Sequence, residues 1–352
     1  MTKDLVEAVK WYRKAAEQNF VQAQYNLGVC YAFGEGVVTN DVEALKWYSK
    51  AAQQNFAYAQ YNLGDCYEHG RGVAKDLVEA ANWYRKAAEQ NFAKGQFSLG
   101  ACYESGIGVT NDAAEAVKWY LKAAEQNNTD AQFRIGVCLE TGRGVVKDAV
   151  MAVKWYRAAA EQNHAKAQVN LGVCYLNGRG VAKDAMEAVN WYRKAAEQNV
   201  ARAQCNLGLC YLNGQGVAKD EMEAIKWFRK AVEQDFAEAQ FNLGVCYLNG
   251  RGVTKDEVEA VKWIRKAAEQ DYAHAQFALG ACCAYGDIIA KDYVNAYKWW
   301  SLATVKGNEK AKELLPRLAH DMSPEQIAEG QKLTRAFQPR KEPESNEPAW
   351  MH

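Results

Sequence analysis

Ten cysteines are the side chains with the greatest capacity for chemistry in this 352-residue chain, because thiols form disulfides, bind zinc and act as nucleophiles. Eight recur every 36 residues, at Cys30, Cys66, Cys102, Cys138, Cys174, Cys210, Cys246 and Cys282. No Cys-x2-Cys pair supports zinc, and equivalent packed helices lie about 8–10 Å apart, beyond the ~7 Å between Cα atoms that a disulfide allows. We interpret them as small buried core residues, with a redox or metal-storage role as the alternative. Cys205 and Cys283, outside this register, suggest only a reducing environment.

Other motifs for catalysis and ligand binding are weak. The Gly-x-Gly segments follow helices rather than strands and lack the third glycine of a phosphate-binding loop, so we interpret them as structural turns. The histidines share no metal-ligand spacing: His69, His164, His274, His320 and His352. Gly-x-Ser-x-Gly and His-Glu-x-x-His are both absent. The sequence therefore predicts no catalytic residue, no metal and no cofactor, and a protein that is not an enzyme.

The same 36-residue period extends well beyond the cysteines. Tryptophan recurs at Trp11, Trp47, Trp83, Trp119, Trp155, Trp191, Trp227, Trp263 and Trp299. A Leu-Gly pair, once Ile-Gly, recurs from Leu27 to Gly280. Periods of 20–50 residues indicate stacked supersecondary units, each too small to bury its own apolar face alone. The elements that position the cysteines are therefore repeats rather than the layers of one globular core.

One period, residues 58–93, shows the expected unit. An apolar stripe at i, i+4, i+7 and i+8 from Ala59 predicts a first helix, which a Gly-Arg-Gly loop from Gly70 ends. Asp76 begins a second helix, and Glu79 three residues later predicts a capping box. Asn91 tolerates the left-handed conformation that ends such a helix. We therefore predict an all-α fold, a right-handed α-solenoid (α/α superhelix) of 36-residue helix-hairpin repeats.

The segment AQYNLGDCYEHGRGVAKDLVEAANWYRKAAEQN resembles the Sel-one-like repeat family, a relative of the tetratricopeptide repeats, at nearly every defined position. The resemblance spans residues 2–309. It implies an adaptor that assembles protein complexes, and some bacterial relatives contact host proteins. A cysteine-rich subgroup of the family binds cell-wall-related ligands and β-lactams. This chain departs from that subgroup, because no repeat has a second cysteine to pair with the first.

The resemblance also implies that the first helices line the concave surface of the solenoid. A helical wheel places an aromatic column and an asparagine column on the side opposite the core. Rings beside amides suit an extended peptide or a helix, which gives the candidate partner-binding residues Tyr25, Asn26, Tyr61, Asn62, Phe97, Phe133, Asn170, Asn206, Phe241, Asn242 and Phe277. The column changes to Val169 and Cys205 midway, which suggests a shallow pocket. The equally weighted alternative is that the rings pack against the next repeat.

Four arginines share the loop position between two glycines: Arg71, Arg143, Arg179 and Arg251. We interpret them as a solvated rim, because the same position elsewhere holds Glu35, Ile107, Gln215 and Asp287. The alternative is an edge that meets acidic partners.

The two ends depart from the regular pattern. Residues 1–21 supply only a second helix, as an N-terminal cap or as the start of a fragment of a longer array, and eight repeats follow over residues 22–309. Residues 310–337 are expected to form C-terminal capping helices, the last beginning at Ser323-Pro324. Residues 338–352 are rich in Pro and Glu and are expected to be disordered.

Charge and hydropathy exclude several classes of partner. Lys plus Arg and Asp plus Glu number 43 each, so no net charge draws the chain to nucleic acid. No apolar run reaches the ~18–20 residues of a membrane span. The start carries no signal peptide, so we expect a cytoplasmic monomer, or a secreted or periplasmic protein if the N-terminus is truncated. We predict a non-enzymatic scaffold or adaptor that binds a protein or peptide on the concave face. The alternative is a binder of small cell-wall-related ligands or β-lactams, possessing weak hydrolase activity.

Overall fold

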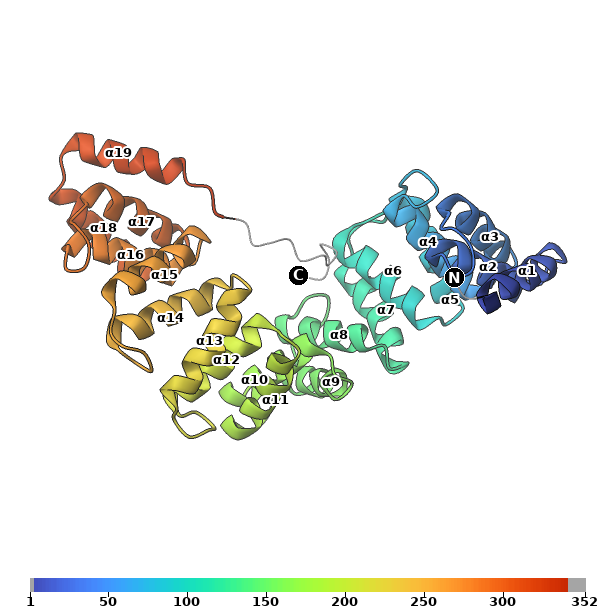
Figure 1. Cartoon of the computed structure of the whole chain (residues 1–352), viewed down its shortest axis with the longest axis horizontal. Coiled ribbons are helices and arrows are strands. Elements are labelled where there is room, and N and C mark those ends of the chain that lie inside the picture. Colours follow the sequence, from blue (N-terminus) through green and yellow to red (C-terminus); the bar gives the residue numbers. More distant parts are fainter. Residues whose placement is uncertain (1–2, 341–352) are drawn as a thin grey trace. The chain divides into compact units, whose positions relative to one another are not determined.

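The computed structural model describes residues 3–340, which fold as an α-solenoid of helix hairpins joined by short connections (Figure 1). This confirms the predicted all-α solenoid of 36-residue repeats, since the described residues hold nineteen helices and no strand. The first helices of the hairpins are α2 (Val21–Phe33), α4 (Ala57–His69), α6 (Ala93–Ser105), α8 (Thr129–Thr141), α10 (Ala165–Asn177), α12 (Ala201–Asn213), α14 (Ala237–Asn249) and α16 (Ala273–Tyr285).

The second helices alternate with them along the chain. They are α1 (Lys3–Glu17), α3 (Asp41–Gln53), α5 (Leu77–Glu89), α7 (Ala113–Glu125), α9 (Ala149–Glu161), α11 (Ala185–Glu197), α13 (Glu221–Glu233), α15 (Glu257–Glu269) and α17 (Tyr293–Val305). The chain divides into two compact units, and each is described by itself. The first unit runs through Ala167 and includes residues 179–181, and the second comprises Gln168–Gly178 and continues from Ala182.

The second helices begin and end where the sequence predicts. Asp76 is the N-cap of α5, and its carboxylate accepts hydrogen bonds from the backbone amides of Val78 and Glu79 at 3.0 Å. Asn91 follows α5 with φ 60°, and Asn, Asp or Gly takes the same left-handed conformation after each second helix from α1 to α17. Local side-chain chemistry therefore sets the hairpin boundaries.

The predicted capping box is wrong in its second half. At the starts of α5, α7, α11, α13 and α15 the glutamate does not reach back to the N-cap amide. Instead Glu115 pairs with Lys118 at 2.7 Å, and the same i, i+3 ion pair forms at the starts of α3, α13 and α15. In these four helices a lysine one turn later competes for the carboxylate, because residues three apart are neighbours on a helix surface, whereas α5 and α11 have Asn82 and Asn190 there.

Glycines set how closely the helices approach. A Cβ added at Gly64, from the Leu-Gly pair, would lie 2.8 Å from the ring of Tyr84, which is buried in the second helix of the same hairpin. Gly72, the second glycine of the loop, has φ 70°, and a Cβ there would lie 2.3 Å from the carbonyl oxygen of Asp41 in the preceding repeat. Gly64 therefore fixes packing within a hairpin, and Gly72 fixes packing between successive hairpins.

The C-terminal end follows the predicted helices. They are α18 (Glu309–His320) and α19 (Pro324–Arg335), and Ser323 and Gln326 form a complete capping box at the start of α19. Residues 338–340 were expected to be disordered, but the amide of Arg340 donates to the carbonyl of Glu269 at 2.8 Å, and its guanidinium lies 3.6 Å from the Asp235 carboxylate. The rest of that expectation, residues 341–352, lies outside the described residues.

Candidate functional site

The aromatic column on the first helices is packed rather than free. Tyr25, Tyr61, Phe133, Phe241 and Phe277 are half-buried, and Phe97, Val169 and Cys205 are buried. Five of the rings lie 5.6–6.3 Å from an aromatic ring of the second helix in the same hairpin: Tyr25, Tyr61, Phe97, Phe133 and Phe277. These rings therefore pack within their own hairpins, whereas the alternative expected them to pack against the next repeat.

One exposed ring beside this column was not predicted from the sequence. Tyr58, the second residue of α4, is 51% exposed. Its ring lies 5.5 Å from Phe56, 6.0 Å from Tyr25 and 4.6 Å from Phe92, which follows α5 of the same hairpin. Phe92 in turn lies 5.7 Å from Tyr61. These five rings, Tyr25, Phe56, Tyr58, Tyr61 and Phe92, form the Tyr58 cluster.

The predicted asparagine column is half-buried throughout: Asn26, Asn62, Asn170, Asn206 and Asn242. Two of these amides already have partners within the protein. Asn62 hydrogen-bonds the hydroxyls of Tyr25 and Tyr48, and Asn242 donates to the Cys205 sulfur at 3.5 Å. At these two positions the amides connect the first helices to neighbouring side chains of the protein.

A buried glutamine column was also missed, and it links the repeats in both units. It comprises Gln24, Gln60, Gln96, Gln132, Gln168, Gln204, Gln240 and Gln276, each at most 2% exposed. In α2, the Gln24 amide donates to the Ala16 carbonyl at 3.3 Å and to Asn19 Oδ1 at 3.0 Å, and Gln24 Oε1 accepts from Gln54 at 2.7 Å. Because buried amides need partners, this column gives the recurring Ala-Gln pair, once Gly-Gln, a structural role.

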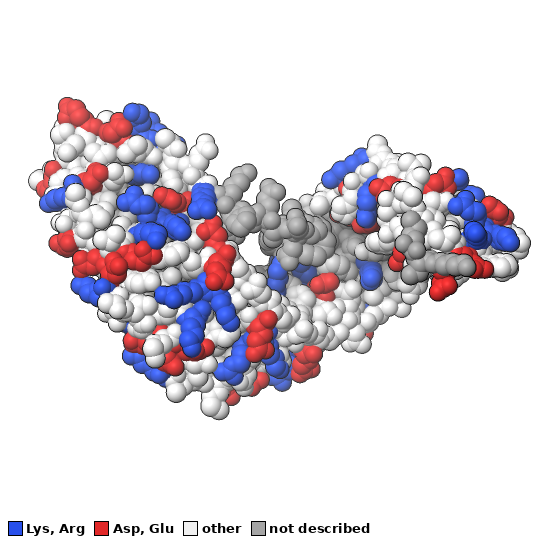
Figure 2. Space-filling model, viewed as in Figure 1, with Lys and Arg blue, Asp and Glu red and all other residues white. Residues whose placement is uncertain are grey.

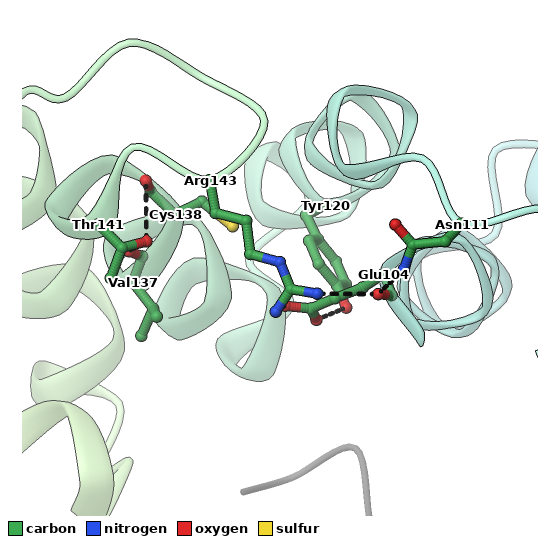
Figure 3. A network of polar contacts seen from close by, with 7 residues as sticks. All are labelled: Glu104, Asn111, Tyr120, Val137, Cys138, Thr141 and Arg143. Carbon is green, nitrogen blue, oxygen red and sulfur yellow. Dashed lines mark hydrogen bonds and ion pairs between the residues drawn. The ribbon is translucent and has the colours of Figure 1, made fainter. Parts of the chain in front are cut away.

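The first unit contains a second polar network, in which glutamates of first helices meet tyrosines of second helices. The hydroxyls of Tyr84, Tyr120 and Tyr156 donate to Glu68, Glu104 and Glu140 at 2.6–2.7 Å. Arg143, from the loop of the next repeat, lies 3.2 Å from the Glu104 carboxylate and donates to the Glu104 carbonyl at 3.0 Å (Figure 3). Burial, and then the glutamate charge, raise the pKa of Tyr84 and of Tyr120, so these hydroxyls stay protonated donors.

The loop arginines are therefore more than a solvated rim. Arg179 pairs with Glu140 at 3.0 Å, as Arg143 does with Glu104. Arg251 donates to the Leu212 carbonyl at 2.8 Å and lies 3.3 Å from Glu221. Arg71 pairs with Asp65 of its own hairpin. Three of the four tie one repeat to the preceding one, which the variable loop sequence did not reveal.

All of the cysteines except Cys282 are buried. Burial raises the pKa of Cys66, Cys138, Cys210 and Cys246 to about 11, and that of Cys102 to about 12. The thiolate is the nucleophilic form, so these side chains are unreactive near neutral pH. Within residues 3–340 no group of three or more His, Cys, Asp or Glu side chains is arranged to hold a metal ion.

The remaining surface has no single-sign charged face in view. Figure 2 shows cationic and anionic side chains interspersed over the visible side of each unit. No helix in the described part of the chain has the length and apolar character needed to cross a membrane. The Tyr58 cluster is consequently the feature of the first unit that most resembles a binding surface.

Comparisons with known proteins agree with this architecture. The family model of the Sel1 repeat matches nine segments, residues 1–20, 21–56, 57–92, 93–128, 129–164, 165–200, 201–236, 237–272 and 273–308. A Sel1 repeat protein from Oxalobacter formigenes is similar at 35% identity and a TM-score of 0.66, over 69% of this chain and 96% of that one. A protective antigen of uropathogenic Escherichia coli, which displays an SLR fold, is similar at 33% identity and a TM-score of 0.53, over 96% of this chain and 88% of that one. None of the curated proteins compared with the chain matches it.

Proposed function

The chain belongs to the Sel1 repeat family, and from that premise we propose that it is a non-enzymatic scaffold whose Tyr58 cluster binds a peptide or protein segment. Sel1 repeat proteins are generally scaffolds for protein interactions rather than enzymes. The observation that carries the proposal is the half-exposed Tyr58 ring, which lies on three other rings from two successive repeats.

The packing around Tyr58 suits it to recognition. Phe56 and Phe92 hold the ring from either side, so little side-chain entropy remains to be lost when a partner covers it. Tyrosine combines a large apolar face with a hydroxyl, and such residues dominate the binding energy of many interfaces. The neighbouring Lys94, exposed at the equivalent position of α6, adds a charge beside the rings. The surface is therefore suited to an extended segment with apolar and polar groups.

A pair of matched substitutions tests the proposal. Tyr58→Ala removes the exposed ring, and Val78→Ala removes a side chain of comparable exposure, 58%, from the second helix α5. Both proteins should keep their helical circular dichroism, because neither side chain belongs to the buried core. Proteins captured from a cell extract by the unmodified chain should be lost with Tyr58→Ala and retained with Val78→Ala. Equal retention by both variants would reject the Tyr58 cluster as the binding surface.

A further inference from the structure

The Glu–Tyr network of the first unit defines a position that we call the glutamate slot, near the C-terminal end of each first helix. Glu68, Glu104 and Glu140 fill this slot in α4, α6 and α8. In α6–α7 the slot is complete, because the Glu104 carboxylate accepts from Tyr120 at 2.7 Å and meets Arg143 at 3.2 Å (Figure 3). The site therefore consists of one tyrosine hydroxyl and one guanidinium around one carboxylate.

At the first hairpin, α2–α3, the tyrosine and the arginine of the slot are both present, but the glutamate is not. Tyr48 and Arg71 occupy the positions equivalent to Tyr120 and Arg143, but the slot itself holds Ala32. A small depression with a volume of about 60 Å³ lies there, and Ala32, Tyr48, Asn62, Arg71 and the two carboxylates of Asp41 and Asp65 are among the residues that line it. Replacing a glutamate with alanine has left a space of the kind that a small carboxylate fills.

The charges around the depression leave donors available. Arg71 pairs with Asp65, which also lies 3.1 Å from His69, but a guanidinium has five N–H donors and this pairing does not use them all. Burial raises the pKa of the Tyr48 hydroxyl, and the hydrogen bond from Asn62 and, more weakly, the charge of Arg71 lower it. Asp41 acts on Cys66, whose pKa burial and that carboxylate raise to about 11. Tyr48 therefore stays a protonated donor, and Arg71 is the cationic side chain of the depression.

We propose that the empty glutamate slot of α2–α3 binds a carboxylate group of a partner segment, with the Tyr48 hydroxyl and the Arg71 guanidinium as donors. The carboxylate belongs to an Asp or Glu side chain or to a C-terminus. The ring of Tyr48 lies 6.0 Å from that of Tyr25 in the Tyr58 cluster, so one short segment reaches both features. The claim that the carboxylate comes from a protein partner rests on the proposed function, whereas the claim that the slot binds a carboxylate does not.

Acetate is the probe, because acetate is what an alanine-for-glutamate exchange removes from the slot. We expect a saturable shift of the Arg71 side-chain resonance on acetate titration at constant ionic strength, with half-saturation at about 1–10 mM for so small a ligand. Acetamide and methylammonium are the neutral and cationic controls. An equal or stronger saturable shift with methylammonium would show a cation site at Asp41 and Asp65 and would overturn the proposal.

Two opposite substitutions sharpen the test. Ala32→Glu places a tethered carboxylate in the slot and should abolish the acetate shift. Glu104→Ala should create a second slot between Tyr120 and Arg143 and so add an acetate-dependent shift of Arg143; this gain keeps the proposal testable even where Ala32→Glu fails to fold. An unchanged Arg71 shift in Ala32→Glu, or no saturable acetate shift in the unmodified protein, refutes the site.

Peptides then separate the two sources of the carboxylate. Segments with an internal glutamate and an amidated end, and segments with a free C-terminus and no acidic side chain, should differ in their ability to compete with acetate at Arg71. The class of peptide that competes with acetate identifies the source of the carboxylate. If neither class competes, the proposal that a partner supplies the carboxylate is contradicted. Acetate binding without partner capture would reject the proposed function alone, and partner capture without acetate binding would reject the slot alone.

Discussion

Three hairpins of the first unit, α4–α5, α6–α7 and α8–α9, hold a glutamate at a position between the two helices that is apolar in the second unit. In α6–α7, Glu104 accepts from Tyr120, whereas α12–α13 has Leu212 beside Phe228 and α14–α15 has Leu248 and Ile264 at the equivalent positions. The glycine beneath the ring is unchanged, since a Cβ at Gly100 or Gly208 would lie 2.7 Å from the ring of Tyr120 or Phe228. Close helix packing is thus fixed by glycine, while the chemistry at the edge of the ring varies, and α10–α11 combines the two solutions by placing Leu176 beside Tyr192.

The largest expected effect is the removal of the ring in either unit. Tyr120→Ala and Phe228→Ala should each lower the free energy of unfolding by about 3–5 kcal/mol, because both rings are fully buried and a cavity would remain. Urea unfolding followed by circular dichroism measures both. A loss below about 1 kcal/mol in one unit alone would break the claim that the ring has the same structural role in both.

A smaller effect is expected when the polar pair is left with one member. Glu104→Leu removes the acceptor of the buried Tyr120 hydroxyl and the carboxylate that faces Arg143. An unsatisfied buried donor costs about 1–3 kcal/mol, so the free energy of unfolding should fall by that amount. Leu212→Val in the second unit is the control for altered volume without altered hydrogen bonding. A neutral Glu104→Leu would mean that solvent already satisfies the tyrosine hydroxyl.

Alkaline pH should affect both units alike, because the buried thiols are common to them. The pKa of Cys66 and of Cys246 is raised to about 11, whereas an unfolded thiol titrates near 8.5. The stabilisation is therefore fully present below about pH 8.5 and is lost as the pH rises toward 11, since only the unfolded chain releases the proton. Cys66→Ala and Cys246→Ala should each reduce the loss of stability between pH 7 and pH 9.5 by about 1 kcal/mol. A pH dependence identical to that of the unmodified protein would contradict the buried, protonated thiols.

The smallest effect is expected when the Glu–Tyr pair of the first unit is converted into the Leu–Phe pair of the second unit. The double substitution Glu104→Leu/Tyr120→Phe removes donor and acceptor together and reproduces the Leu–Phe pair of α12–α13. Its free energy of unfolding should lie within about 1 kcal/mol of the unmodified value, well above that of Glu104→Leu alone. A double-mutant cycle completed with Tyr120→Phe gives the coupling energy. Additive losses would show that the two side chains act independently.

Local features of the fold were predictable from sequence because their causes are local. Asp76 and Asn91 mark the ends of α5 through their own backbone and side-chain bonding, and the Leu-Gly period reports the close packing of each hairpin. The Glu104–Tyr120 bond was not predictable, because its partners are 16 residues apart on different helices and meet only once the hairpin has closed. The pairing of Glu115 with Lys118 instead of with the cap depends likewise on competition between partners.

The candidate site was predictable only in part. The aromatic column was found, but the exposure of each ring depends on side chains of other helices, above all the second helix of its own hairpin, which a helical wheel does not contain. Tyr58 escaped notice because most repeats place Lys, Arg, Asp, Glu or His at its position. A comparison of equivalent positions across the repeats, in search of residues that differ from the majority, would have identified both Tyr58 and Ala32.

The most direct test of a scaffold that binds through the Tyr58 cluster is site-specific photo-crosslinking. A benzoylphenylalanine at position 58 should form covalent adducts with partner proteins in a cell extract, whereas the same residue at position 78, equally exposed on α5, should form few. Mass spectrometry of the adducts identifies both the partner and the residues in contact. Adducts confined to position 58 are the predicted result; equal adducts at both positions, or adducts at position 78 alone, would contradict it.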